Sequence, residues 1–267
     1  SWVAPSAYFV GIAAIICSGI ILKKTKLFAG DPAPFVMELP AYHLPTVGSV
    51  LRSMWERGWS FIKKAGTIIL LSTIVLWFLQ GYGWGPDGFG AVELENSILA
   101  SIGNAIAWIF TPLGWTQGGQ GWKMAVAAVT GLIAKENVVA TFGVLFGFAE
   151  VAEDGAEIWG DLAACMTTVS AYSFLVFNLL CAPCFAAMGA IKREMNNTRW
   201  FFIAIGYQCG LAYLLSLCIY QIGTCITTVA FVIGTAVSLV IIALFIWLLV
   251  RPYNQVGKLK VNLNGMS

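Results

Sequence analysis

The chain has 267 residues, of which 59% are hydrophobic and 10% are charged, and its mean hydropathy is +0.81. A soluble domain carries about 25% charged residues, so this chain has too little polar surface to cover itself in water. The formal net charge of +2 is small, and the distribution of charge along the chain is more informative than its sum. This composition excludes a soluble protein and predicts an all-α protein whose solvent is lipid.

The amino-terminal third predicts two spans joined by polar segments. Residues 6–22 form the first span, which ends at a cluster of lysines, and the prolines of residues 31–45 forbid a continuous helix after it. In residues 46–64 apolar and basic residues are interleaved, which is typical of an amphipathic helix lying on the membrane surface. Residues 65–79 form the second span, and residues 80–96 form a glycine-rich loop with acidic side chains.

The remaining sequence predicts five further membrane segments, two of which are interrupted. The interrupted segments are residues 122–148, with the pair Lys135 and Glu136 at their middle, and residues 162–191, which contain Cys181-Ala182-Pro183-Cys184. The other three are uninterrupted: residues 97–110, 200–220 and 224–250. Eight tryptophans near the predicted interfaces are interpreted as belt anchors: Trp55, Trp59, Trp77, Trp84, Trp108, Trp115, Trp122 and Trp200.

Charges support a topology of about seven membrane segments. If Lys23 is cytoplasmic and the sides alternate, every basic residue except Lys135 is cytoplasmic, whereas the acidic loops around Glu93 and Glu153 are external. This positive-inside pattern predicts a cytoplasmic carboxy-terminus. The chain begins at Ser1 in an apolar stretch with no basic segment before it, so we expect a piece of a longer polypeptide rather than a signal peptide.

The first polar constellation is the Lys135–Glu136 pair at membrane depth. A charge at the bilayer centre costs about 2.5 to 3.5 kcal/mol, so such residues persist where they face a cavity, a partner or a substrate path. We expect the helix to break here and to offer backbone groups to a ligand. The alternative is an internal ion pair, although adjacent side chains point about 100° apart on a helix and pair poorly.

The second constellation is a stripe of soft ligands around a proline. Because Pro183 has no N–H, the carbonyl of Leu179 loses its helical partner. The surrounding spacing of three, three and four places one amide, two thiols and one thioether on the same helix stripe: Asn178, Cys181, Cys184 and Met188. Sulfur ligands with a freed carbonyl favour a late first-row divalent metal. Kinked packing and a redox Cys-x-x-Cys remain as alternatives.

A third constellation, residues 38–45, contains Glu38, Tyr42 and the only histidine, His43. It is interpreted either as an ordinary connector or as a coupling element beside the surface helix. The lone histidine is more typical of a hydrogen-bonded structural residue than of a ligand.

These three motifs, in this order and spacing, resemble the membrane portion of ferrous iron transport protein B. They are Pro34-Phe35-Val36-Met37-Glu38-Leu39-Pro40-Ala41-Tyr42, Gly131-Leu132-Ile133-Ala134-Lys135-Glu136 and Cys181-Ala182-Pro183-Cys184. The resemblance implies a polytopic helical bundle with broken or re-entrant helices and a gate-type fold similar to that of nucleoside transporters. It divides the chain into four parts: the end of a first gate region and a connector (1–45), a linking region (46–96), a second gate region (97–220), and a last span with a cytoplasmic tail (221–267).

The resemblance also implies Fe²⁺ as the transported substrate, no tightly bound cofactor, and a multi-pass location in the bacterial inner membrane. The expected partners are lipid, an amino-terminal GTPase domain of the same polypeptide and small cytoplasmic accessory proteins, with a homo-oligomer as a further candidate and no nucleic acid. The chain has no Gly-x-x-x-x-Gly-Lys-Ser/Thr motif, so we do not expect it to be an enzyme by itself. The family's gate cysteine pair corresponds to Cys181 and Cys184, and its gate acidic residue to Glu136.

The resulting hypothesis is a loose Fe²⁺ site near the bilayer midplane. Cys181, Cys184, Asn178 and the Leu179 carbonyl are its candidate ligands with Met188 beyond, Glu136 compensates charge, and Lys135 orders Glu136 or guards the path. Pro183, Glu38 and Tyr42 have gating or structural roles in this hypothesis. Two other classes stay open: a transporter of a nucleoside-like solute, which would need hydrogen-bonding side chains rather than sulfur, and a membrane scaffold without transport.

Overall fold

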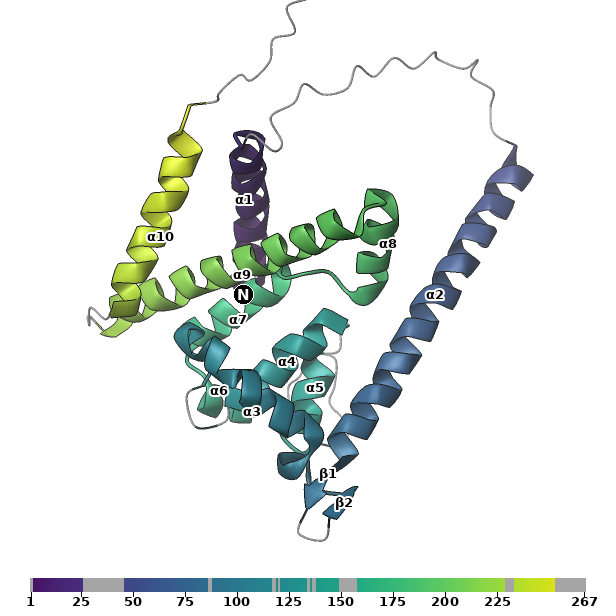
Figure 1. Cartoon of the computed structure of the whole chain (residues 1–267), viewed down its shortest axis with the longest axis horizontal. Coiled ribbons are helices and arrows are strands. Elements are labelled where there is room, and N and C mark those ends of the chain that lie inside the picture. The colour runs from purple at the N-terminus through teal and green to yellow at the C-terminus, as the bar shows by residue number, and fades with distance from the viewer. Residues whose placement is uncertain are drawn as a thin grey trace, which may run out of the picture.

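A computed structural model describes residues 2–25, 46–85, 88–116, 119, 121–133, 135, 138–148, 158–228 and 233–252. Two glutamates and a tyrosine of the sequence hypothesis, Glu38, Tyr42 and Glu136, lie outside the described residues. The described residues are helical apart from one short hairpin (Figure 1). Their elements, in chain order, are α1 (Val3–Lys23), α2 (Val47–Gly81), β1 (Tyr82–Gly85), β2 (Gly88–Ala91), η1 (Leu94–Asn96), α3 (Ile98–Phe110), η2 (Thr111–Leu113), α4 (Gly121–Ile133), α5 (Val138–Leu145), α6 (Trp159–Cys165), α7 (Thr168–Leu180), α8 (Phe185–Met195), α9 (Thr198–Thr228) and α10 (Ile233–Val250).

The described part of the chain contains fewer full-length spans than the seven segments expected from the sequence. Helices α1, α9 and α10 are long and apolar enough to cross a membrane, and α6 with α7 forms a fourth candidate that is bent by 103°. The difference arises because several apolar segments are short or broken. The 13 residues of α3 extend about 20 Å at 1.5 Å per residue, which is less than the hydrocarbon thickness of about 30 Å.

Both expected interruptions are present, with one break that was not predicted. Helix α4 ends at Ile133 and α5 begins at Val138, while α7 ends at Leu180 and α8 begins at Phe185. The additional break separates α6 from α7, where the side chain of Thr167 caps α7 by accepting a hydrogen bond of 3.2 Å from the Ser170 N–H. A threonine at the amino end of a helix satisfies a backbone donor that would otherwise lack a partner.

Two boundaries differ from the sequence prediction. The predicted surface helix and second span form one continuous helix, α2, of 35 residues, since no proline interrupts the sequence between them. Likewise α9 continues through residues 221–223 to Thr228, beyond its predicted end. The glycine-rich segment after α2 contains the antiparallel hairpin β1–β2, in which Trp84 pairs with Phe89 and their rings meet edge to face. Aromatic cross-strand pairs stabilise such a hairpin.

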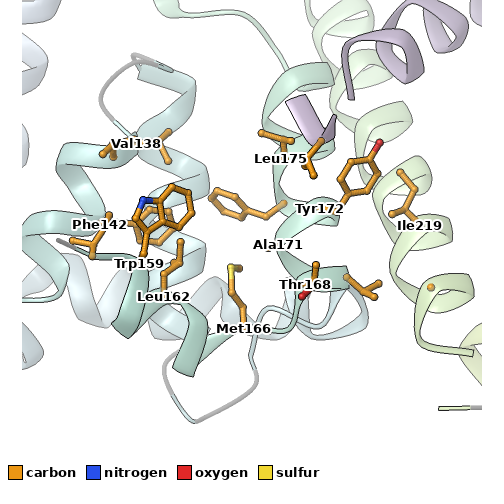
Figure 2. Close-up of a pocket in the computed structure, with 16 residues that line it drawn as sticks. Val138, Phe142, Trp159, Leu162, Met166, Thr168, Ala171, Tyr172, Leu175 and Ile219 are labelled. Carbon is orange, nitrogen blue, oxygen red and sulfur yellow. The ribbon is translucent and has the colours of Figure 1, made fainter. Parts of the chain in front are cut away.

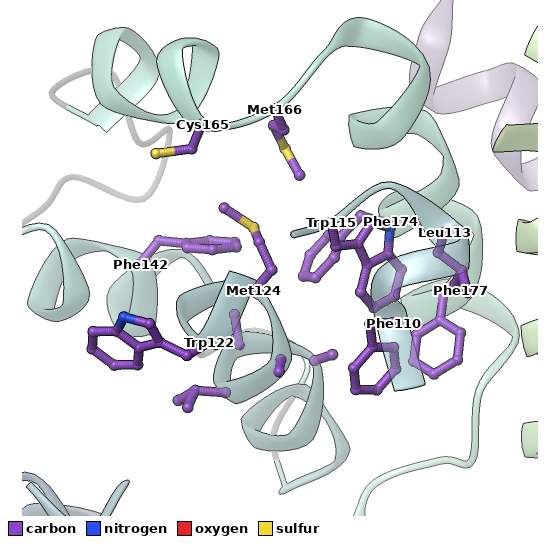
Figure 3. Packing of buried hydrophobic residues seen from close by; sticks show 14 of the residues in the cluster. Phe110, Leu113, Trp115, Trp122, Met124, Phe142, Cys165, Met166, Phe174 and Phe177 are labelled. Atoms are coloured by element: carbon purple, nitrogen blue, oxygen red, sulfur yellow. The ribbon is translucent and has the colours of Figure 1, made fainter. Parts of the chain in front are cut away.

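The core lies where α3, α4, η2 and α7 meet, and it is built around Trp115 (Figure 3). Trp115 is fully buried, and its ring is stacked on that of Phe110 with the two ring centroids 4.8 Å apart. The rings of Phe174 and Phe177 meet it edge to face, with centroids 5.0 and 5.2 Å away. Trp122 is also buried. The assignment of these two tryptophans to an interfacial belt is therefore wrong, because they fill the interior where short helices converge.

Small residues bring the helices into close contact. The buried Ser173 of α7 donates a hydrogen bond of 3.0 Å to the carbonyl of Ser216 in α9. In α3, a Cβ atom at Gly103 would lie 3.0 Å from the carbonyl oxygen of Trp122, so only glycine permits this approach of α3 to α4. Small and hydroxyl-bearing residues are typical of helix interfaces in membranes, where backbone proximity replaces the hydrophobic effect as the source of packing energy.

Candidate metal-ion site at two helix breaks

The break between α7 and α8 exposes backbone groups inside the bundle. The N–H of Cys181 closes α7 by donating a hydrogen bond of 2.8 Å to the Phe177 carbonyl, and α8 begins after Cys184. Pro183 offers no N–H to the preceding turn, so the carbonyl of Leu179 has no helical donor. Cys181 and Ala182 are nonetheless buried, at 3% and 2% exposure. Polar backbone atoms are thus held within an apolar environment, where they need partners.

The break between α4 and α5 supplies such a partner. Lys135 lies between the two helices, and its side-chain Nζ donates to the carbonyl oxygens of Leu179 at 3.3 Å and Cys181 at 3.4 Å. The carbonyl that Pro183 leaves without a helical donor is therefore occupied by a cation from the other broken segment. The Lys135 ammonium is thus satisfied by backbone carbonyls, and the sequence analysis places this lysine at membrane depth, where charged side chains are typical of substrate paths.

Asn178 turns its amide oxygen toward the same meeting point. Its Nδ2 donates a hydrogen bond of 3.0 Å to the Phe174 carbonyl within α7, which orients Oδ1 toward the end of α4. A Cβ atom at Gly131 would lie only 2.7 Å from this oxygen and 3.0 Å from Val138 of α5. Gly131 therefore allows the ends of α4, α5 and α7 to approach closely, and the Asn178 amide oxygen lies at this approach.

The sulfur atoms are arranged differently from the sequence hypothesis. Cys181 Sγ lies 3.6 Å from the Sγ of Cys209, a residue of α9 that the sequence hypothesis did not include. Cys184 and Met188 are half-buried, and among the described residues no hydrogen bond joins their side chains to Lys135 or to the Cys181 thiol. The sequence contained no signal for Cys209, because only the packing of α9 on α7 brings it to Cys181.

The arrangement does not form a closed cage for a metal ion. Among the described residues, no three His, Cys, Asp or Glu side chains are clustered closely enough to hold one. Three kinds of group lie at the two breaks. The carbonyls of Leu179 and Cys181 accept from Lys135, the Asn178 amide oxygen lies against Gly131, and the Cys181 thiol contacts Cys209. Such an incomplete set of ligands suits an ion that has to be released.

An apolar cavity of about 590 Å³ lies elsewhere, between α5, α6, α7 and α9 (Figure 2). Its walls consist almost entirely of hydrocarbon and aromatic side chains, including Phe142, Trp159, Met166 and Ile219. Neither Lys135 nor any residue from 181 to 184 lines it. A cavity with so few polar groups cannot replace the hydration shell of a cation, so the helix breaks are the better candidate for an ion path.

Comparisons with known proteins agree with these features. Residues 4–57 match the family model described as the C terminus of ferrous iron transport protein B, and residues 62–198 match the Gate model described as nucleoside recognition. The chain belongs to the FeoB family. The Gate match contains both helix breaks of this FeoB chain, whereas Cys209 lies beyond its end.

Relatives from distant organisms cover the same portion of FeoB. A protein named Fe(2+) transporter FeoB from Methanocaldococcus jannaschii is 35% identical over 225 residues, which is 82% of this chain and 32% of that protein. Its namesake from Staphylococcus aureus is 32% identical over 84% of this chain and 32% of its own length. A Porphyromonas gingivalis protein named as a fusion of Fe(2+) transport protein A and Fe(2+) transporter FeoB is 31% identical over 81% of this chain and 30% of its length.

This FeoB chain thus spans about a third of the length of these relatives. No solved structure matches the chain. The family membership and the candidate spans together identify a multi-pass membrane protein.

Proposed function

We propose that this chain is the carboxy-terminal membrane part of a transporter that moves Fe²⁺ across the bacterial inner membrane. The observation that carries the proposal is the meeting of two broken helices, where Lys135 donates to the carbonyls of Leu179 and Cys181. Paired broken helices are where secondary transporters bind their substrates. The names of the FeoB relatives supply the substrate, since each names Fe²⁺.

In this proposal the arriving ion takes the place of the Lys135 ammonium. The Leu179 and Cys181 carbonyls and the Asn178 amide contribute oxygen ligands, and the Cys181 thiolate contributes a soft ligand that favours Fe²⁺ over Mg²⁺ or Ca²⁺. Glu136 compensates the charge of the ion. When the ion leaves, Lys135 returns to the carbonyls, so they are never left without a partner inside the membrane.

The chain functions within a larger assembly in this proposal. An amino-terminal GTPase domain of the same polypeptide lies in the cytoplasm, and the carboxy-terminus after Arg251 is cytoplasmic in keeping with the positive-inside pattern. Small accessory proteins are further partners, which the fusion protein from Porphyromonas gingivalis supports because its name joins a transport protein A to FeoB.

Uptake of radioactive iron by cells tests the proposal. Cells would carry the full-length polypeptide with Cys181→Ser, Cys184→Ser or Glu136→Ala, and Cys225→Ser of α9 is the matched control. We expect the Cys181 and Glu136 variants to lose most of their uptake while the control keeps it. Wild-type uptake by both the Cys181→Ser and the Glu136→Ala variants would overturn the proposal. Inhibition of uptake by nucleosides but not by divalent metals would favour the solute transporter suggested by the Gate description.

A further inference from the structure

Two thiols from separate helices face each other beside the helix breaks. Cys181 comes from the end of α7 and Cys209 from the middle of the continuous helix α9, and their Sγ atoms are 3.6 Å apart. The Cys181 side chain is buried and that of Cys209 is half-buried, and all seven cysteines are free thiols. A disulfide would require about 2.05 Å between the sulfurs, so the pair is reduced and separate in this structure.

The separation of the sulfurs fits a shared metal ion. Two sulfur ligands that each lie about 2.3 Å from one tetrahedral metal ion are about 3.8 Å apart. The observed 3.6 Å corresponds to an angle of about 103° between the two metal–sulfur bonds, which is close to tetrahedral. In this structure the Cys181 thiol donates a hydrogen bond to Cys209 Sγ across this distance, so the pair would need little movement to exchange the shared proton for an ion.

We propose that Cys181 and Cys209, rather than Cys181 and Cys184, are the sulfur ligands of a soft divalent metal ion at this site. The inference deepens the proposed function and rests on it for the identity of the metal as Fe²⁺. Each thiol loses its proton to water when the ion binds, and the two new metal–sulfur bonds join two thiolates to one divalent ion. The resulting unit has no net charge, which lowers the cost of placing it among apolar side chains.

The carbonyl oxygen of Cys181 links this thiol pair to Lys135. The same residue that presents a sulfur to Cys209 also presents its carbonyl to the Lys135 ammonium. An ion held by the thiolates would lie beside that carbonyl and would compete with the ammonium for it. Cys209 thereby becomes a residue that determines metal preference, because its sulfur adds a second soft ligand to a site otherwise built from oxygens.

Absorption spectroscopy with Co²⁺ tests the pair on the purified chain. Co²⁺ bound by thiolates gives charge-transfer absorption in the near ultraviolet whose intensity rises with the number of sulfur ligands. The wild-type chain and four variants would be kept reduced in detergent micelles and titrated with Co²⁺. The variants are Cys181→Ser, Cys209→Ser, Cys184→Ser and the control Cys225→Ser. We expect Cys181→Ser and Cys209→Ser each to lose about half of the absorption or more, since each removes one of two sulfurs.

The comparison of Cys209→Ser with Cys184→Ser decides the assignment. Full absorption in Cys184→Ser and Cys225→Ser supports the pair, whereas full absorption in Cys209→Ser, or no absorption in the wild-type chain, overturns it. If Cys209→Ser does not fold by circular dichroism, protection from alkylation in the wild-type chain replaces it. Cd²⁺ should then protect Cys181 and Cys209 together, and protection of Cys184 in place of Cys209 would overturn the assignment.

Failure of this pair can be told apart from failure of the proposed function. If Cys181→Ser abolishes iron uptake while Cys209→Ser changes neither uptake nor absorption, the thiol pair is wrong and the ion path through the α7–α8 break remains. If absorption depends on both cysteines but uptake depends on neither, the pair is a metal site and the transport role of this site is wrong.

Discussion

Replacing Lys135 with methionine should tighten metal binding at the helix breaks. In the wild-type chain an arriving ion has to displace the ammonium from the Leu179 and Cys181 carbonyls, and this interaction is lost on binding. Methionine keeps the length and apolar stem of the side chain but leaves no charge to displace. The substitution therefore removes a competitor of the metal ion without removing any of its proposed ligands. Because a methionine thioether can itself bind a soft metal ion, Lys135→Leu, which adds no sulfur, should show the same tightening.

The size of the effect follows from the two hydrogen bonds. Hydrogen bonds to charged groups contribute about 1.5 to 3 kcal/mol. The distances of 3.3 and 3.4 Å exceed the usual N–H···O length of about 2.9 Å, so the lower end of this range applies. Two such bonds at the lower end contribute about 3 kcal/mol together, which corresponds to a dissociation constant lower by about a factor of 100.

Co²⁺ titration of the chain in detergent micelles measures this change. Lys123→Met is the matched control, because Lys123 is a buried lysine of α4 whose Nζ lies 4.9 Å from the centre of the Phe146 ring rather than against the carbonyls. We expect tighter binding in Lys135→Met and unchanged affinity in Lys123→Met. An unchanged or weaker affinity in Lys135→Met would refute the idea that the ammonium competes with the ion.

Two further predictions concern packing and are read from the thermal unfolding of purified variants. Gly131→Ala forces a Cβ atom to within 2.7 Å of Asn178 Oδ1 and should cost about 1 to 3 kcal/mol. Gly19→Ala of α1 meets nothing within 4 Å and should raise the melting temperature, because alanine is favoured over glycine inside a helix; equal melting temperatures for the two variants would contradict the contact. Ser173→Ala removes the hydrogen bond to the Ser216 carbonyl and should cost about 1 kcal/mol of stability. Ser216→Ala removes a buried hydroxyl that has no partner among the described residues, so it should be neutral or stabilising. A larger loss of stability in Ser216→Ala than in Ser173→Ala would contradict this order.

The sequence was sufficient to predict the α4–α5 and α7–α8 breaks, but neither the α6–α7 break nor all of the helix lengths. Pro183 and the charged pair at Lys135 are local signals, and both mark places where the backbone leaves the helix. The break between α6 and α7 has only Thr167 as its mark, and a threonine inside an apolar run is too common to predict a bend of 103°. The burial of Trp115 was missed because a tryptophan at the end of an apolar segment looks the same whether lipid or protein surrounds it.

The same distinction between local and tertiary information applies to the candidate site. The freed carbonyl of Leu179 was predicted from Pro183 alone, and the structure adds that Lys135 occupies it. The roles predicted for Cys184, Met188 and Glu136 stay predictions. Cys209 could not have been predicted, since it comes close to Cys181 only through the packing of α9 against α7.

Iron K-edge X-ray absorption of the Fe²⁺-loaded chain tests the central claim most directly, because it reports the atoms that surround the ion. We predict sulfur neighbours at about 2.3 Å together with oxygen neighbours, and weaker sulfur scattering in Cys181→Ser. A spectrum with only oxygen or nitrogen neighbours, or one that Cys181→Ser leaves unchanged, would contradict an iron site at the meeting of the two helix breaks.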